Sequence, residues 1–280
     1  MVARLAHEHL WLETYLRLNK RVRVYVSSSC ETIANRIEAS AGTRLVNRQE
    51  VGVIGYEENA HLPCEPWRPL TTQEQAALLA KHPPRDAGRT VSIVKLPGPF
   101  SGALWKNFQP VDTTNVPDAI IQPLSAICKL GEPLDWIGPV ENSPGLKTVT
   151  VNNEDERYIG LHLDSWDDLP LEDRARSTNR ICLNIGQSDR YFLFLPFSLI
   201  EMSGLLSEFA DWDSNTPHIM LGDHFMERFP HVPAIRCRLQ PGEAYIAPTE
   251  NLLHDGSSEG QRYIDEQFTV RGHIRPLSTI

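Results

Sequence analysis

The C-terminal half of the chain, from about residue 146, is a succession of short strand-like segments separated by turns. Apolar residues alternate, or run briefly, in segments 146–151, 158–164, 180–185, 191–195, 234–239, 243–247 and 262–274. Only residues 198–212 interrupt this series with helical spacing. Many short strands with regular turn signals favour a β-sandwich or jelly roll over a parallel α/β sheet.

The N-terminal half has a mixed pattern. Helical spacing occurs in residues 3–18, 72–81 and 119–130, and strand-like spacing occurs in residues 21–26 and 90–95. We therefore predict one domain over residues 1–280, mainly β with flanking helices. Residues 146–275 would form a jelly-roll core, and residues 1–145 an α/β elaboration that builds part of the substrate pocket.

Charge and apolar content limit the partners of this chain. Its 27 basic and 36 acidic residues give a formal charge of −9 without a long basic run, so neither nucleic acid nor an anionic membrane is an expected partner. The polar N-terminus is wrong for a signal peptide, and eighteen apolar residues never run together, so we expect a cytoplasmic protein. The five cysteines lack metal-site spacing and are expected to be buried thiols. A small molecule or a peptide is the expected partner.

Two distant segments carry residues that can hold a metal. His162 and Asp164 are separated by one residue in a strand-like segment, so both side chains point to the same side. His254 follows far downstream, after the Pro241-Gly242 turn. Two imidazoles and one carboxylate form the ligand set that binds a redox-active metal on one face and leaves other positions open. The sequence therefore predicts a metal site at His162, Asp164 and His254.

At these residues the chain resembles a known family. The order His-x-Asp, long gap, His and then Arg is similar to the iron(II)- and 2-oxoglutarate-dependent dioxygenases, whose double-stranded β-helix belongs to the cupin-like jelly rolls. Gly242, Pro248 and His254 also look like the second cupin motif. The interval from proline to histidine is one residue longer than in that motif, and its final asparagine is absent. This departure favours the dioxygenase branch over an ordinary metal cupin.

The resemblance, which covers residues 146–275, implies a cofactor and a reaction. His162, Asp164 and His254 would bind iron(II), 2-oxoglutarate would chelate the metal as cosubstrate, and O2 would occupy the last position. The product would be an amino acid, peptide or small specialised metabolite hydroxylated at an unactivated C–H bond. Because the metal carries this chemistry, we expect no catalytic residue beyond the three ligands. In the halogenating branch a small residue replaces the carboxylate, so Asp164 favours hydroxylation over chlorination, while desaturation, ring closure and demethylation stay open.

The resemblance also requires an arginine for the distal carboxylate of 2-oxoglutarate, because a guanidinium can donate two hydrogen bonds to it. Arg262 and Arg271 are the candidates, and on a regular strand they would face opposite sides. We expect one of them to serve and prefer Arg262. Asn184 and Arg190 are weaker alternatives.

Other residues have alternative interpretations. Trp166, just after the metal segment, would form a stacking wall for substrate or would simply pack in a loop. Asp255 would hydrogen-bond a ligand imidazole or begin a turn. His218, His224 and His231 form a loose series that suggests a second metal site only weakly.

Two alternative functions stay open from the sequence. One is a metal-binding cupin that does not use 2-oxoglutarate, either another kind of dioxygenase or a sensor without catalysis. The other is a jelly-roll binding module that holds no metal.

Overall fold

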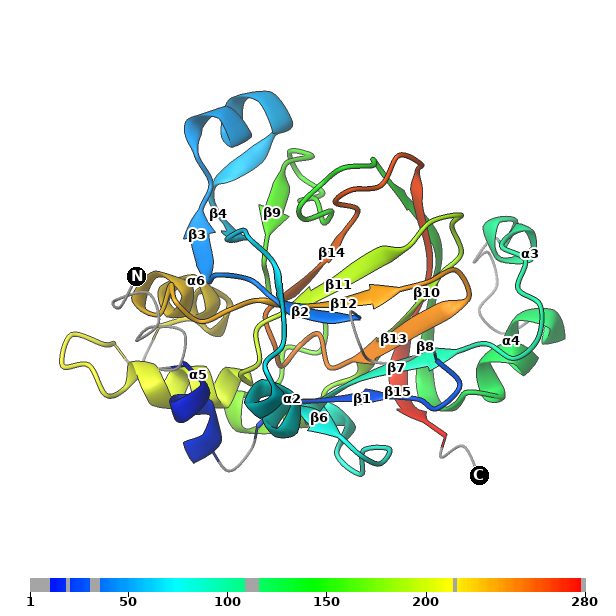
Figure 1. Ribbon diagram of the computed structural model, residues 1–280, viewed down its shortest axis with the longest axis horizontal. Helices are drawn as coiled ribbons and strands as arrows, with labels where there is room; N and C mark the ends of the chain where they lie inside the picture. The colour runs from blue at the N-terminus through cyan, green and yellow to red at the C-terminus, as the bar shows by residue number, and fades with distance from the viewer. Residues whose placement is uncertain (1–10, 19–20, 31–35, 109–115, 214–215, 278–280) are drawn as a thin grey trace.

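The strands are arranged in three open sheets, and helices flank them (Figure 1). The structure is a computed structural model that describes residues 11–18, 21–30, 36–108, 116–213 and 216–277. The largest sheet has the strand order β6 (Leu79–Ala80), β1 (Arg23–Val26), β7 (Thr90–Lys95), β13 (Glu243–Ala247), β10 (Asn179–Asn184), β15 (Asp265–Pro276), β8 (Cys128–Asn142). The fold is thus mixed α/β and rich in strands.

The remaining strands form two smaller sheets. The second sheet has the order β14 (His254–Ser257), β11 (Arg190–Phe194), β12 (Ile235–Leu239), β2 (Ile37–Ala39), β5 (Arg68–Pro69). The third has the order β3 (Thr43–Leu45), β4 (Tyr56–Pro63), β9 (Tyr158–Gly160). From β10 to β15 the chain passes back and forth between the first and second sheets. In the first sheet β10 pairs with β13 and β15, in the second β11 pairs with β12 and β14, and all four pairs are antiparallel.

The helices are short and lie around the sheets. They are η1 (Glu50–Ile54), α2 (Thr72–Leu78), η2 (Ala87–Arg89), α3 (Ala103–Lys106), α4 (Asp118–Ser125), η3 (Leu171–Arg176), α5 (Leu199–Leu206), α6 (His218–Arg228). In Figure 1, α3 and α4 lie at the β8 edge of the large sheet, and α5 and α6 lie at the opposite end of the molecule.

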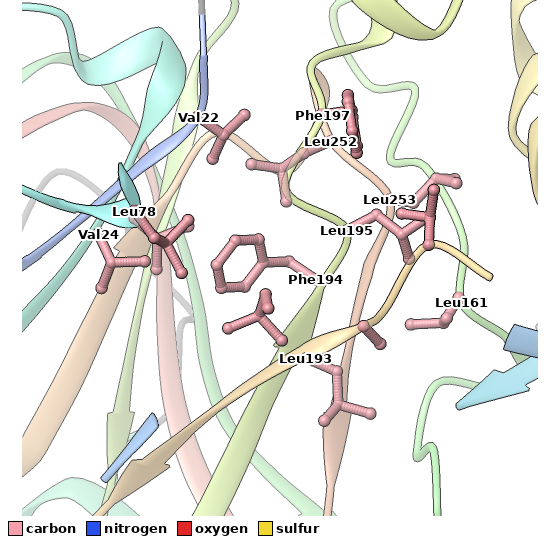
Figure 2. Packing of buried hydrophobic residues seen from close by; sticks show 14 of the residues in the cluster. Val22, Val24, Leu78, Leu161, Leu193, Phe194, Leu195, Phe197, Leu252 and Leu253 are labelled. Carbon is pink, nitrogen blue, oxygen red and sulfur yellow. The ribbon is translucent and has the colours of Figure 1, made fainter. Parts of the chain in front are cut away.

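The apolar residues form two main clusters on the two faces of the large sheet. One cluster joins this sheet to the second sheet, and in Figure 2 Val24, Leu78 and Phe194 meet in it. The other cluster includes Ile181 and Phe268 and is covered by residues of α3 and α4. Because side chains alternate along β10, Cys182 belongs to the first cluster while its neighbour Ile181 belongs to the second. The face that carries Cys182 is therefore the one that also builds the interior site described below.

Most of the predicted strands are confirmed with small shifts at their ends. The segments predicted at 21–26, 90–95, 180–185, 191–195, 234–239, 243–247 and 262–274 correspond to β1, β7, β10, β11, β12, β13 and β15. The helix predicted at 72–81 is α2, which ends at Leu78 and begins with a capping box between Thr71 and Glu74. Residues 11–17 of the helix predicted at 3–18 are helical, and residues 1–10 lie outside the described part.

Other predictions of secondary structure are wrong. Residues 146–151 form no strand beyond an isolated bridge from Val151 to Tyr158. The helices predicted at 119–130 and 198–212 are confirmed as α4 and α5, but their predicted C-terminal ends are wrong, because the helices end at Ser125 and Leu206. The sequence analysis also missed β8 and α6. β8 contains Gly, Pro and charged residues, which an edge strand tolerates because only one side of it must pair.

The N-terminal half takes part in the same sheet as the C-terminal half. β1 and β7 are hydrogen-bonded to each other in parallel, and β7 pairs with β13, while β8 pairs along most of its length with β15. The boundary between residues 145 and 146 stays a prediction, but four strands that precede it, β1, β6, β7 and β8, belong to the large sheet.

Phe194 supports a prediction about stability. Its side chain is 0% exposed between the two larger sheets. We expect Phe194→Ala to lower the free energy of unfolding by about 3–5 kcal/mol, because it removes apolar burial and leaves a cavity. Urea unfolding followed by circular dichroism measures this change. Ile219→Ala, at a side chain that is 55% exposed, is the control and should change stability by less than about 0.5 kcal/mol; equal effects of the two substitutions would contradict the packing described here.

Candidate metal centre

The three predicted metal ligands converge. The donor atoms of His162, Asp164 and His254 all lie within 4.8 Å of one another. Nε2 of His162 is 3.7 Å from Oδ1 of Asp164, and Nε2 of His254 is 3.8 Å from Oδ2 of the same carboxylate. This group could hold a metal ion, and within the described ranges it is the one group of three or more His, Cys, Asp or Glu residues that meets this criterion.

Backbone hydrogen bonds bring the distant segments together. The N–H of His162 donates to the carbonyl of His254 at 3.1 Å, and the N–H of His254 donates to the carbonyl of His162 at 2.9 Å. The strand predicted at 158–164 is regular only as β9, and Gly160 then turns with a φ of 74°. A Cβ at residue 160 would lie 2.6 Å from the carbonyl oxygen of His61, so glycine is required for this approach.

Carbonyl groups orient both imidazoles. Nδ1 of His162 is 3.0 Å from the carbonyl oxygen of Gly160, and Nδ1 of His254 is 3.2 Å from that of Leu252. When Nδ1 carries the proton and donates it to a carbonyl, Nε2 keeps its lone pair for a metal. Both Nε2 atoms face Asp164, so the arrangement presents two nitrogen donors and one oxygen donor to the same point.

Asp255 lies against the ligand set from the other side. Its Oδ1 accepts hydrogen bonds from the backbone N–H groups of Val149 and Thr150 and from the Thr150 hydroxyl. Its Oδ2 is 3.5 Å from Nδ1 of His162, and the carboxylate is fully buried. The expectation that Asp255 faces a ligand imidazole is therefore met at His162, rather than at its sequence neighbour His254.

The charges of the site affect the two histidines in opposite ways. Burial lowers the pKa of His254 to about 4, which keeps this imidazole neutral. Burial has the same tendency at His162, but hydrogen bonds to Asp164 and Asp255 outweigh it and raise its pKa to about 10. Burial opposes ionisation of Asp164 as well, yet Arg180 and the two histidines hold its pKa well below the ordinary value. A bound metal would displace the proton from His162.

Arg180 is a residue of this site that the sequence analysis missed. Its Nη2 donates to Oδ2 of Asp164 at 2.8 Å, and, although burial opposes this shift, the nearby Asp164 and Tyr245 raise the pKa of Arg180. Its Nε is buried and lacks a hydrogen-bond partner among the described residues. Arg180 shares the interior face of β10 with Cys182, and this alternation was the one sequence signal that could have revealed it.

The two predicted cosubstrate arginines lie in different surroundings. Arg262 is exposed in the turn before β15, so the argument from strand parity does not apply to it. Arg271 is on β15, directly opposite Arg180 of β10. Its guanidinium lies 3.2 Å from Asp167 and 3.5 Å from Glu250, so carboxylates already neutralise its charge.

The two weaker candidates for cosubstrate contact, Asn184 and Arg190, are both bonded to other parts of the protein. The carboxamide nitrogen of Asn184 donates to the carbonyls of Ser188 and Leu239, both at 2.9 Å. Arg190 forms an ion pair with Asp265 at 2.8 Å, and both side chains are 1% exposed. Both residues therefore hold turns and strand ends together: the amide donors of Asn184 and the charge of Arg190 already have partners.

The remaining sequence predictions have simple outcomes. His218 and His224 lie on α6, and the histidine series forms no group that meets the metal-site criterion in the described part of the chain. Cys128, Cys182 and Cys237 are buried thiols, as expected, while Cys30 and Cys64 are half-buried. None of the helices in the described ranges is both long and apolar enough to cross a membrane.

Asp255 supports a prediction about metal affinity. Asp255→Asn should weaken metal binding by about 10- to 100-fold, because an amide can neither balance the charge of the metal-bound His162 nor orient that ring as the carboxylate does. Equilibrium dialysis against Zn²⁺ measures the affinity. The matched control is Asp223→Asn on α6, at a carboxylate that is 40% exposed; equal metal affinities for both variants and the unmodified protein would contradict this role of Asp255.

Comparison with known proteins adds no relative from which to infer a function. No protein-family model matches the sequence, and no curated protein and no solved structure matches it either. The case for a metal-dependent function therefore depends on the group formed by His162, Asp164 and His254.

Proposed function

We propose that this protein is an iron(II)- and 2-oxoglutarate-dependent oxygenase that hydroxylates an unactivated C–H bond. The observation that carries the proposal is the convergence of His162, Asp164 and His254 from distant segments. Two histidines and one carboxylate are the ligand set of non-haem iron(II) oxygenases, in which three further coordination positions are open. When bound there, iron(II) with 2-oxoglutarate and O2 would supply the oxidising chemistry.

The strand order supports a jelly roll as the core of this enzyme. A jelly roll consists of two antiparallel sheets between which the chain passes repeatedly. β8, β15, β10 and β13 are consecutive in the first sheet, and β14, β11 and β12 are consecutive in the second. The bridge between His162 and His254 adds the metal-binding segment beside β14. The metal ligands then lie at one end of a sandwich formed by these strands.

Arg180 and Tyr245 are the residues that we propose for the distal carboxylate of 2-oxoglutarate. Arg180 contacts the metal ligand Asp164 and pairs with that single carboxylate, whereas Arg262 is exposed and Arg271 pairs with three carboxylates. Burial raises the pKa of Tyr245 well above its ordinary value, so its hydroxyl remains a hydrogen-bond donor. A guanidinium and a phenol together can donate to both oxygens of a carboxylate.

The protein would contribute binding and orientation rather than acid–base catalysis. The carbonyls of Gly160 and Leu252 set the tautomers of the two histidines, and Asp255 lies against His162. The buried ring of Phe192 lies 5.9 Å from the ring of His254 and supports one side of this ligand. The substrate that we propose is an amino acid, a peptide or another small metabolite.

Calorimetry without oxygen tests the proposal. We expect the iron(II)-loaded protein to bind one equivalent of 2-oxoglutarate, and the metal-free protein to bind it at least about 100-fold more weakly, because chelation supplies much of the affinity. Succinate does not chelate in this way and is the control ligand. Binding of 2-oxoglutarate that is independent of the metal would overturn the proposal, and metal binding without any 2-oxoglutarate binding would favour a cupin that does not use this cosubstrate.

A further inference from the structure

The loop that follows Asp164 is held rigidly beside the metal centre. Glu250, which is 1% exposed, accepts hydrogen bonds from the backbone N–H groups of Trp166 at 3.2 Å and Asp167 at 2.9 Å. The carboxylate of Asp167 in turn accepts from the backbone N–H and the hydroxyl of Thr178. Arg174 lies 3.3 Å from Glu250 and is also buried. Buried charges therefore hold this loop in one conformation.

Trp166 projects from this rigid loop toward solvent. Its side chain is 58% exposed, so burial of apolar area does not explain its position. The guanidinium carbon of Arg271 lies 5.1 Å from the centre of the indole, which supports one side of the ring. A tryptophan that is both fixed and exposed presents an aromatic surface that a ligand can contact.

Trp166 is connected to the metal ligands through two arginines, Arg271 and Arg180. Arg271 is directly opposite Arg180 in the pairing of β10 with β15, and Arg180 contacts Asp164 at 2.8 Å. Trp166 itself follows Asp164 by two residues. A substrate whose reacting carbon lies near the metal would therefore extend past the indole of Trp166.

The surroundings of the indole carry excess negative charge. Arg271 and Arg174 are the cations of the group, and four carboxylates pair with them: Asp135, Asp167, Asp168 and Glu250. Asp135 and Asp168 are 50% and 85% exposed. An aromatic face beside exposed carboxylates attracts an ammonium or guanidinium group by cation–π and Coulomb attraction.

We propose that Trp166, with Asp135 and Asp168, recognises a cationic group of the substrate. This inference depends on the proposed oxygenase function, and it narrows the substrate class to compounds with an ammonium or guanidinium group, such as a basic amino acid or a peptide with a basic residue. The indole face and the two carboxylates bind the cation, while a C–H bond several atoms away lies at the metal.

Binding of matched ligands tests this recognition without turnover. The Zn²⁺-loaded protein with 2-oxoglutarate is titrated with L-arginine and L-lysine, and with L-citrulline and L-norleucine as neutral counterparts. We expect each cationic ligand to bind at least about 10-fold more tightly than its neutral counterpart, a difference in keeping with a cation–π contact. Equal affinities for arginine and citrulline, or no binding of any of the four, would overturn the proposal.

Variants assign the effect to the named residues. Trp166→Ala should weaken the binding of arginine about 10-fold, and Trp166→Phe should retain most of it. Asp168 has a φ of 47°, which asparagine tolerates, so Asp168→Asn removes the charge without adding backbone strain. This variant should bind arginine more weakly and citrulline with unchanged affinity. Tyr263→Ala, at a side chain that is 60% exposed, is the control and should change nothing.

The same titrations separate this inference from the proposed function. Loss of arginine binding in Trp166→Ala with unchanged Zn²⁺ and 2-oxoglutarate binding supports the recognition site. Unchanged arginine binding in that variant overturns the recognition site and leaves the oxygenase function standing. Failure of the wild-type protein to bind 2-oxoglutarate in the presence of metal would instead count against the oxygenase function itself.

Discussion

Replacing His254 with alanine is expected to abolish iron-dependent activity and to lower the affinity for iron(II) by about 100-fold or more, because one of only three protein ligands is lost. The ring of His254 is buried and neutral, and its Nε2 faces Asp164. Alanine leaves the backbone bonds between residues 162 and 254 in place. Iron bound after anaerobic dialysis measures the effect directly.

The control for this substitution is another histidine. His224 lies on α6 with a side chain that is 42% exposed, and it belongs to no metal-binding group among the residues that the structure describes. His224→Ala should bind one equivalent of iron(II), as the unmodified protein does. If His254→Ala retained the same stoichiometry and affinity, iron would bind elsewhere and the assignment of these ligands would fail.

Replacing Arg180 with alanine is expected to weaken the binding of 2-oxoglutarate by about 100-fold, because the buried cation that would meet its distal carboxylate is removed. Arg180→Lys should recover only part of this loss, since an ammonium cannot donate in the planar, paired geometry of a guanidinium. The affinity is measured by calorimetry on the metal-loaded protein in the absence of oxygen.

Arg262→Ala is the matched control, because Arg262 is an exposed arginine in the turn before β15. It should leave the affinity for 2-oxoglutarate unchanged. Arg271→Ala should disturb the loop around Glu250, because it removes an ion pair with this residue, and should have little effect on the affinity for 2-oxoglutarate. A large loss of 2-oxoglutarate affinity in Arg262→Ala, together with normal affinity in Arg180→Ala, would contradict our assignment. The cosubstrate arginine would then be Arg262, as the sequence spacing predicts.

The ligand group was predictable because each step depends on local geometry. Strand alternation predicted that residues 162 and 164 share a side, and a histidine beyond a Pro-Gly turn was the remaining donor. β9 ends at Gly160, yet both side chains still reach the same point. The convergence that this reasoning predicts is the one the structure shows. The strands from residue 180 onward were also predictable, because β10, β11, β13 and β15 combine apolar runs with turn residues at their ends.

The other parts depend on contacts that a single sequence does not reveal. Arg180 reaches Asp164 only because β10 pairs in one register with β13 and β15, and that register is a property of the folded sheet. β8 resembles a loop until its pairing with β15 is known. Arg262 was preferred because the last strand was expected to begin there, yet β15 begins at Asp265 and leaves Arg262 in an exposed turn.

Consumption of 2-oxoglutarate by the iron-loaded protein is the measurement that tests the central claim most directly. We predict that succinate and carbon dioxide form in equal amounts when iron(II), 2-oxoglutarate, O2 and a cationic substrate are all present. The protein with His162, Asp164 and His254 all replaced by alanine should form neither product. If the wild-type protein bound one iron(II) and still formed no succinate with any such substrate, the metal centre would exist but the proposed oxygenase would not.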